Sequence, residues 1–220
     1  MTVLITGANR GIGLQMAHDY AKAGETVIGT MRRTAPDETG IRWEQLEVTD
    51  PKSHAALALR LDRQPIDLLI CNAGVYLDKH ENLADGYDAE MWAKSFAVNV
   101  TGVFQTVQNL LPHLQMSHAP KIAIISSQMA SDTRAPGGSY IYRSSKAAAL
   151  NLGRNLAADL KDLGVAVGIY HPGWVQTDMG GGNADISVQQ AADGLRQRFA
   201  ALCVDTTGCF ETYDGKTHAY

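Results

Sequence analysis

The sequence predicts an α/β fold: a doubly wound parallel sheet of about seven strands with helices on both faces. Short apolar runs alternate with helical patterns along the whole chain, which is typical of parallel sheets built from strand–helix–strand units. A glycine-rich turn at residues 6–13 joins the first apolar run directly to the first helical pattern. The 220 residues show no internal repeat or linker, so we expect a single domain spanning residues 1–220.

The predicted strands are short runs rich in apolar and β-branched residues. They cover residues 2–5, 26–30, 43–46, 68–71, 121–126, 165–170 and 208–212. The run at 68–71 (Leu-Leu-Ile-Cys) is wholly apolar, as in strands buried on both faces of a parallel sheet. Ligands of doubly wound sheets bind at the carboxyl ends of the strands. Residues that directly follow the strands are therefore the candidates for function.

The predicted helices cover residues 12–23, 51–61, 89–115, 142 to about 163, and 188–202. Asp50 precedes Pro51 and suits a helix N-cap, because proline is favoured at the first helical position. The long 89–115 helix carries Asn99 in an apolar stretch, where an asparagine is normally a satisfied core amide or a cap. The polar segment 75–88 contains His80 without ligand partners at metal-binding spacing, and we interpret it as a surface loop without a metal site.

Composition narrows the classes of function. The 19 basic and 23 acidic residues give a net charge of -4, which offers no electrostatic basis for binding nucleic acid or an anionic membrane. No apolar run approaches the ~20 residues of a membrane-spanning helix, and no basic leader precedes the first strand. The three cysteines are odd in number and lack metal-ligand spacing, so we expect a reducing, cytoplasmic location.

The glycine-rich turn has the spacing G-x-x-x-G-x-G, formed by Gly7, Gly11 and Gly13. Small residues allow the backbone to approach a pyrophosphate, and the N-terminus of the following helix presents free N–H groups to the anion. A glycine-rich turn by itself is more often a tight turn than a binding site. Between a strand and a helix, however, it favours a dinucleotide cofactor.

The end of the second strand indicates which cofactor binds. NAD-binding proteins place an acidic residue near this position to bind the ribose hydroxyls, whereas an arginine accommodates the 2′-phosphate of NADP. Here Met31 occupies the place of the acid, and Arg32 and Arg33 follow. The two arginines could simply be solvated surface residues, but with the acid missing we predict NADP(H), with NAD(H) as the alternative cofactor. Arg10, inside the glycine turn, could add a second contact.

Tyr142 and Lys146 lie four positions apart in a predicted helix, so their side chains share one face. A nearby positive charge favours the ionised form of a phenol, and Lys146 could supply it. Such pairs also arise by chance. The prediction gains weight because other notable residues follow the predicted strands in order: the glycine turn, Arg32, Asn72, Ser127 and Pro172-Gly173.

Together these motifs resemble the short-chain dehydrogenase/reductase family, and the resemblance covers nearly the whole chain. The residues that carry it are the turn at 6–13, Asp50, Asn72-Ala73-Gly74, Asn99, Ser127, Tyr142 with Lys146, and Pro172-Gly173. The runs 142–146 and 171–181 are similar to the C-factor-like branch of carbonyl reductases. The resemblance implies a Rossmann-type NAD(P)-binding domain with the catalytic site built in.

The resemblance also implies catalytic roles. Tyr142 would be the general acid that protonates a substrate carbonyl as hydride arrives, or the base in the reverse direction. Lys146 would lower the pKa of the tyrosine and bind the nicotinamide ribose. Ser127 would hold the substrate oxygen, with Ser126 and Ser131 as alternatives, and Asn99 would bind a water that relays protons from Lys146.

The cofactor contacts implied by the resemblance and by the turn are Gly7, Asn9, Arg10, Gly11, Ile12, Gly13, Arg32, Asp50, Asn72, Ala73, Gly74, Tyr142, Lys146, Pro172, Gly173, Val175 and Thr177. Among them, Asp50 would meet the adenine, and Val175 and Thr177 would meet the nicotinamide end. The segment 179–187, which covers the substrate in this family, is short and rich in glycine. We therefore expect a flexible or open pocket that does not specify a substrate.

We expect an NADP(H)-dependent oxidoreductase that reduces an aldehyde or ketone to an alcohol, or catalyses the reverse. The alternative is a catalytically silent NADP(H)-binding sensor or signalling protein of the same fold. A nucleotide-sugar epimerase would need a larger C-terminal domain than the roughly forty residues after Met179. The partner of the expected oxidoreductase would be a small carbonyl or alcohol substrate. By resemblance, the helices carrying Asn99 and Tyr142 would pair in a homodimer or homotetramer, although both faces could instead be buried within one subunit.

Overall fold

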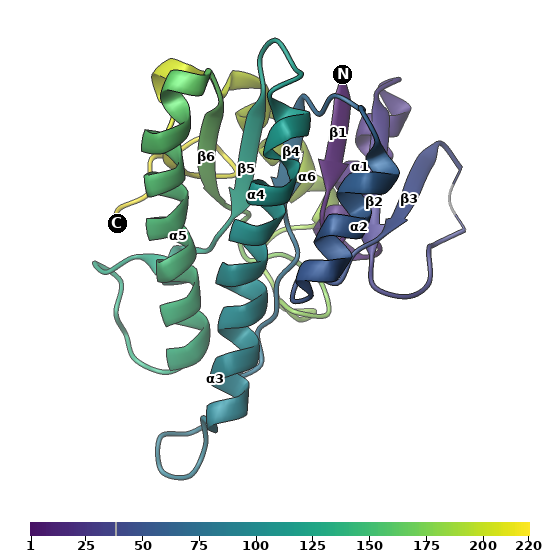
Figure 1. Ribbon diagram of the computed structural model, residues 1–220. Helices are drawn as coiled ribbons and strands as arrows, with labels where there is room; N and C mark the ends of the chain where they lie inside the picture. The colour runs from purple at the N-terminus through teal and green to yellow at the C-terminus, as the bar shows by residue number, and fades with distance from the viewer. Residues whose placement is uncertain (38) are drawn as a thin grey trace.

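The computed structural model describes residues 1–37 and 39–220 and contains one seven-stranded sheet (Figure 1). Every neighbouring pair of strands is parallel, and the strand order is β3-β2-β1-β4-β5-β6-β7. The strands are β1 (Thr2–Ile5), β2 (Thr26–Met31), β3 (Ile41–Gln45), β4 (Leu68–Cys71), β5 (Lys121–Ile125), β6 (Ala166–His171) and β7 (Phe210–Thr212). The predicted doubly wound α/β fold is confirmed, and most strand boundaries differ from the predicted ones by no more than two residues.

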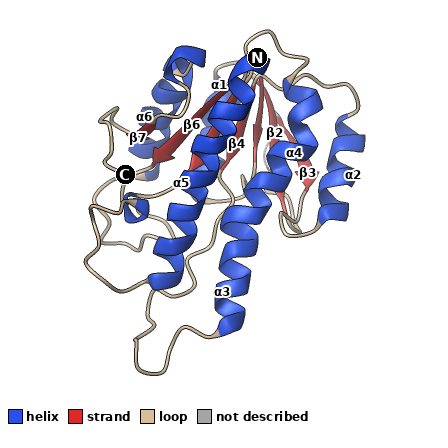
Figure 2. Ribbon diagram, turned by 60° about the vertical axis from the view of Figure 1, so that its left-hand side comes forward, coloured by secondary structure: helices blue, strands red, loops and turns tan. Residues whose placement is uncertain are grey.

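Helices cover both faces of the sheet (Figures 1 and 2). They are α1 (Gly11–Lys22), α2 (Pro51–Leu61), α3 (Ala89–Phe96), α4 (Gly102–Leu114), α5 (Tyr140–Leu160) and α6 (Val188–Ala201). One apolar core joins the sheet to α2, α4 and α5 through residues such as Leu57, Leu110 and Leu156. A second core joins it to α1 and α6 through Met16 and Phe199.

The predicted helix over residues 89–115 is divided by a π-helical turn. This turn (η1, Ala97–Thr101) lies between α3 and α4 and contains Asn99. The flanking caps, Phe96 and Gly102, keep right-handed helical dihedral angles, so the chain continues in one direction through the turn. π-helical turns are rare and are often found at functional sites. Here the turn carries a predicted catalytic residue.

Short 3₁₀ turns complete the fold: η2 (Gln128–Ala130) after β5, η3 (Lys161–Leu163) after α5, and η4 (Val204–Thr206) before β7. Helix α5 begins two residues before Tyr142, so Tyr142 and Lys146 both lie near its N-terminus. Because all strands are parallel, the ends of β1, β4, β5 and β6 meet at one edge of the sheet, close to this end of α5.

Candidate active site

The glycine turn packs against the end of β4 without room for side chains. A Cβ on Gly7 (φ +62°) would lie 3.0 Å from the Ala73 Cα, and one on Gly13 would lie 2.5 Å from Asn72 Nδ2. Asn72 Nδ2 donates to the carbonyls of Thr6 (3.0 Å) and Gly7 (3.1 Å). Thr6 Oγ1 accepts from the backbone N–H groups of Asn72 and Ala73. The turn, β1 and β4 are therefore held together at this edge of the sheet.

Helix α1 points its N-terminus into the space above this turn. Its first turn contains no acidic residue, and within the described part of the chain its N-cap residue, Arg10, makes no side-chain capping bond. The first N–H groups of a helix lack partners inside the helix and favour an anion. The tight backbone cradle and this helix end fit the pyrophosphate of a dinucleotide.

A cavity of about 540 Å³ extends from the glycine turn to Tyr142. It brings together most of the predicted cofactor residues. These are Gly7, Asn9, Arg10, Gly11, Ile12, Gly13, Arg32, Asn72, Ala73, Gly74, Tyr142, Lys146, Pro172 and Thr177. The cavity is also lined by Glu47, Val48, Ser126 and Met179.

Asp50 lies outside this lining. Its carboxylate accepts a hydrogen bond from the Lys52 N–H (3.0 Å) and caps α2, as Pro51 in the first turn suggested. Glu47 and Val48 line the cavity just before it. The structure thus places Asp50 in its capping role, and the contact with adenine stays a prediction.

Gly173 and Val175 are not among the residues that line the cavity. Gly173 has φ +89°, and a Cβ there would lie 2.5 Å from Ile186 Cδ1. Val175 is buried and forms a β-bridge with Ile186. Both residues support the loop that carries Pro172 and Thr177, two residues that do line the cavity.

Tyr142 is buried, and burial is the largest effect raising the pKa of its phenol above the ordinary value. An interaction with Ser127 lowers this pKa, whereas the nearby Tyr76 and Asp78 raise it. Lys146 Nζ lies 5.7 Å from the centre of the Tyr142 ring. Burial therefore sets the direction of the shift in this structure, and the lowering of this pKa by Lys146 stays a prediction.

Lys146 is itself buried, which lowers its pKa to about 8. Its Nζ donates to the Ile125 carbonyl at the end of β5 (2.9 Å). A Cβ on Gly74 would lie 3.5 Å from this nitrogen and 3.3 Å from Asn99 Oδ1. Gly74, Asn99 and Lys146 therefore meet at one point beside the cavity.

Asn99 is 1% exposed and its amide is well satisfied. Oδ1 accepts from the Val75 N–H, and Nδ2 donates to the Val75 carbonyl and to Ser145 Oγ, each at 2.9 Å. The side chain thereby fixes the backbone that follows Gly74. Its predicted water-binding role stays a prediction.

The three candidate serines have different partners. Ser127 Oγ accepts from the Met129 N–H (3.1 Å), and its interaction with Tyr142 lowers the pKa of the phenol. Ser126 Oγ donates to the Lys146 carbonyl (3.0 Å). Ser131 Oγ contacts Thr133 Oγ1 and donates to the Tyr220 carbonyl. The effect on Tyr142 favours Ser127 as the partner of this phenol, whereas Ser126 is the one of the three that lines the cavity.

Comparison with known proteins identifies the family to which this chain belongs. The model of short chain dehydrogenases matches residues 1–185. The chain belongs to the short-chain dehydrogenase family. It is therefore an NAD(P)-dependent oxidoreductase, and it lies in the carbonyl-reductase-like branch.

Three of its relatives illustrate the range of this family. The chain is 34% identical to 1-hydroxy-2-glutathionyl-2-methyl-3-butene dehydrogenase of Rhodococcus sp. (strain AD45), over 97% of each chain. It is 35% identical to C-signal of Myxococcus xanthus, over 73% of this chain and 96% of that protein. The structure of NADPH-bound carbonyl reductase from chicken fatty liver superposes with a TM-score of 0.89, at 29% identity over 100% of this chain and 98% of that one.

Two residues beside Tyr142 lie outside the predicted set. The polar segment 75–88 is typical of a surface loop, but Asp78 is 1% exposed and Tyr76 stacks on Tyr142 with ring centres 4.2 Å apart. The apolar start of the segment, Val75-Tyr76-Leu77, was the available signal for burial.

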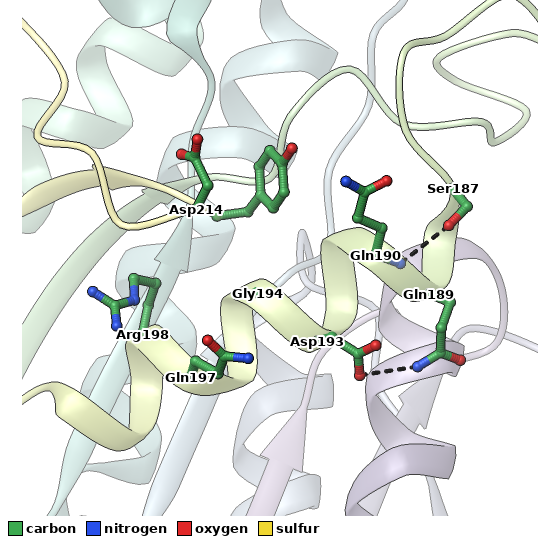
Figure 3. A pocket seen from close by; sticks show the side chains of 9 residues that line it. Ser187, Gln189, Gln190, Asp193, Gly194, Gln197, Arg198 and Asp214 are labelled. Carbon is green, nitrogen blue, oxygen red and sulfur yellow. Dashed lines mark hydrogen bonds between the residues drawn. The ribbon is translucent and has the colours of Figure 1, made fainter.

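A second cavity, of about 560 Å³, lies along α6 (Figure 3). Some of its polar groups bond to one another: Ser187 Oγ accepts from the Gln190 N–H, and Gln189 Nε2 donates to Asp193 Oδ1 (Figure 3). Others bond to residues outside the lining, such as Gln189 to Asp19 and Arg198 to Glu211. The glycine turn, Tyr142 and Lys146 line the other cavity.

Within the described ranges 1–37 and 39–220, no group of three or more His, Cys, Asp or Glu side chains could hold a metal ion. In the same ranges, no helix combines the length and the apolar character that a membrane span requires.

Proposed function

We propose that this dehydrogenase reduces an aldehyde or ketone to an alcohol with NADPH, or catalyses the reverse with NADP⁺, and that Tyr142 is the general acid or base. One observation carries the proposal. The phenol of Tyr142 is buried and interacts with Ser127, one helical turn from Lys146, and it lines the same cavity as Lys146 and the glycine turn. A positioned acid of this kind typically contributes about 10²–10⁴-fold to a rate.

The roles of the residues follow from their contacts. When bound, the nicotinamide would supply or accept the hydride. Tyr142 gives its phenolic proton to the carbonyl oxygen, and the Ser127 hydroxyl donates a second hydrogen bond to the charge developing there. Lys146, held by the Ile125 carbonyl, places a positive charge beside the phenolate that remains.

We assign NADP(H) as the preferred cofactor. Met31 and Arg32 line the cavity at the end of β2, where an acidic residue would select NAD. An arginine there can neutralise the 2′-phosphate, and the similarity to an NADPH-bound carbonyl reductase supports the same choice. The cytoplasmic location remains our proposal and rests on three free cysteines.

The test is NADPH oxidation, followed by absorbance, against 4-nitrobenzaldehyde, a methyl ketone, a quinone and a 3-oxoacyl thioester. We expect turnover of at least one compound, and Tyr142→Phe should lower kcat about 10²–10⁴-fold while leaving the Kd for NADPH within about twofold. Tyr140→Phe is the matched control, because Tyr140 lies in the same helical turn but is 38% exposed. Undiminished turnover by Tyr142→Phe would exclude the proposed acid.

A sensor or signalling protein of the same fold is the second candidate, and the similarity to C-signal favours it. Such a protein could lose the catalytic side chains without loss of function. This chain has Asn99, Ser127, Tyr142 and Lys146, which favours the enzyme. Tight NADPH binding without turnover of any compound would reverse that preference.

A further inference from the structure

The helix that carries the catalytic tyrosine has no capping side chain of its own. Its N-cap residue is Ser139, in the left-handed region (φ +48°), and within the described part of the chain its side chain makes no capping bond. The first N–H groups of a helix need partners from elsewhere. In α5 these groups belong to the turn that contains Tyr142.

Asp78, from the segment after β4, supplies the missing acceptor. Its Oδ2 accepts from the Ile141 N–H (2.8 Å), and both carboxylate oxygens lie 3.2 Å from the Tyr142 nitrogen. This is the bond that an N-cap side chain normally makes to the second and third residues of a helix. Here the acceptor is remote in sequence, and one of the donors is the backbone of the catalytic residue.

Asp78 is only 1% exposed. A buried carboxylate is costly unless it is hydrogen-bonded, and bonds from N–H groups to a charged oxygen are stronger than neutral ones. Its negative charge also suits the positive end of the helix dipole. Removal of this side chain would leave buried N–H groups without partners at the start of α5.

Tyr76 holds the same turn through its ring. The rings of Tyr76 and Tyr142 are stacked, with an angle of 21° between their planes, and Tyr76 Oη lies 2.5 Å from Ser139 Oγ. Both backbone groups of the preceding residue, Val75, are bonded to Asn99. The segment from Val75 to Asp78 is thus fixed at one end by the π-helical turn and at the other by α5.

We propose that Asp78 and Tyr76 are positioning residues that hold the Tyr142 phenol in register with Ser127, a role that rests on the proposed function. The groups facing the phenol are Ser127 after β5, Lys146 on α5, and Tyr76 and Asp78 on the 75–88 segment. Burial is the largest effect raising the pKa of Tyr142, and the Asp78 carboxylate adds to it. Asp78 therefore also helps to keep the acid protonated.

The test compares Asp78→Ala, Asp78→Asn and Tyr76→Leu with wild type and Tyr142→Phe, using the panel compound that is reduced fastest. We expect Asp78→Ala and Tyr76→Leu to lower kcat at least tenfold at neutral pH, with the Kd for NADPH within twofold. Asp78→Asn should recover most of the rate, because an asparagine oxygen caps about as well as aspartate. Asp85→Ala, in an exposed part of the same segment, is the control.

The rate recovered by Asp78→Asn separates positioning from a purely structural role. Positioning predicts a loss confined to kcat in Asp78→Ala that Asp78→Asn restores, while the Kd for NADPH and the midpoint of thermal unfolding stay close to wild type. If Asp78→Ala does not fold, Tyr76→Leu decides the matter, because it leaves the Asp78 cap in place. Unchanged kcat in Tyr76→Leu, or in a folded Asp78→Ala, would overturn the proposal. Turnover by Tyr142→Phe would instead overturn the proposed function, which distinguishes the two failures.

Discussion

Burial governs the protonation of the two ionisable side chains at the centre of the site. It raises the pKa of the Tyr142 phenol and lowers the pKa of Lys146 to about 8. The four-residue spacing was enough to predict that both side chains share one face of a helix, because that follows from helical geometry. It could not predict which electrostatic effect is larger, because depth of burial depends on the elements packed around α5.

The lowered pKa of Lys146 predicts how stability depends on pH. In the unfolded chain its pKa is about 10.4, so between pH 8 and 10.4 the unfolded state binds more protons than the folded state. The free energy of unfolding should therefore rise with pH in this window, by on the order of 3 kcal/mol from this group. Urea unfolding at pH 7.5, 8.5 and 9.5 measures it. Lys146→Met should show a flatter dependence, and equal slopes for the two proteins would contradict the assignment.

Arg32 gives a prediction about cofactor choice. Arg32→Asp should weaken NADPH binding by roughly 10–100-fold, the range expected for a lost hydrogen bond to a charged group, with a much smaller effect on NADH. The reason is that only NADPH carries the 2′-phosphate. Fluorescence titration of both cofactors measures the two Kd values, and Arg33→Asp is the control, since Arg32 rather than Arg33 lines the cavity. Equal losses for NADPH and NADH would show that Arg32 does not meet the phosphate.

At the scale of elements, periodicity predicted the strands and most helices but not how two segments shape the site. The helix over 89–115 contains a π-helical turn at Asn99, and a shift from i→i+4 to i→i+5 bonding leaves the apolar pattern nearly unchanged. The 75–88 segment looked like a polar loop because Asp78 finds its partners 63 and 64 residues further along the chain. Local sequence carries no sign of a cap supplied from that distance.

At the scale of the molecule, the order of motifs predicted that the candidate residues lie at one edge of the sheet, because parallel strands bring their carboxyl ends together there. The glycine turn, Asn72, Ser127 and Pro172 are far apart in sequence, and each follows a different strand. Their assembly needed only the topology. The substrate could not be predicted in this way, because the wall formed near Met179 depends on loop side chains that no periodic pattern positions.

The faces of α4 and α5 lead to a prediction about assembly. The two helices cover the same face of the sheet (Figure 2), and Phe104 on α4 remains 41% exposed. We expect a second copy of the chain to cover this face, so light scattering after gel filtration should give two or four times the 23.7 kDa of one chain. Phe104→Arg should then yield monomers, because burying an unpaired charge is costly. Leu59→Arg, at an exposed site on α2, should leave the mass unchanged. A monomeric wild type would instead mean that these helices bury their apolar faces within one subunit.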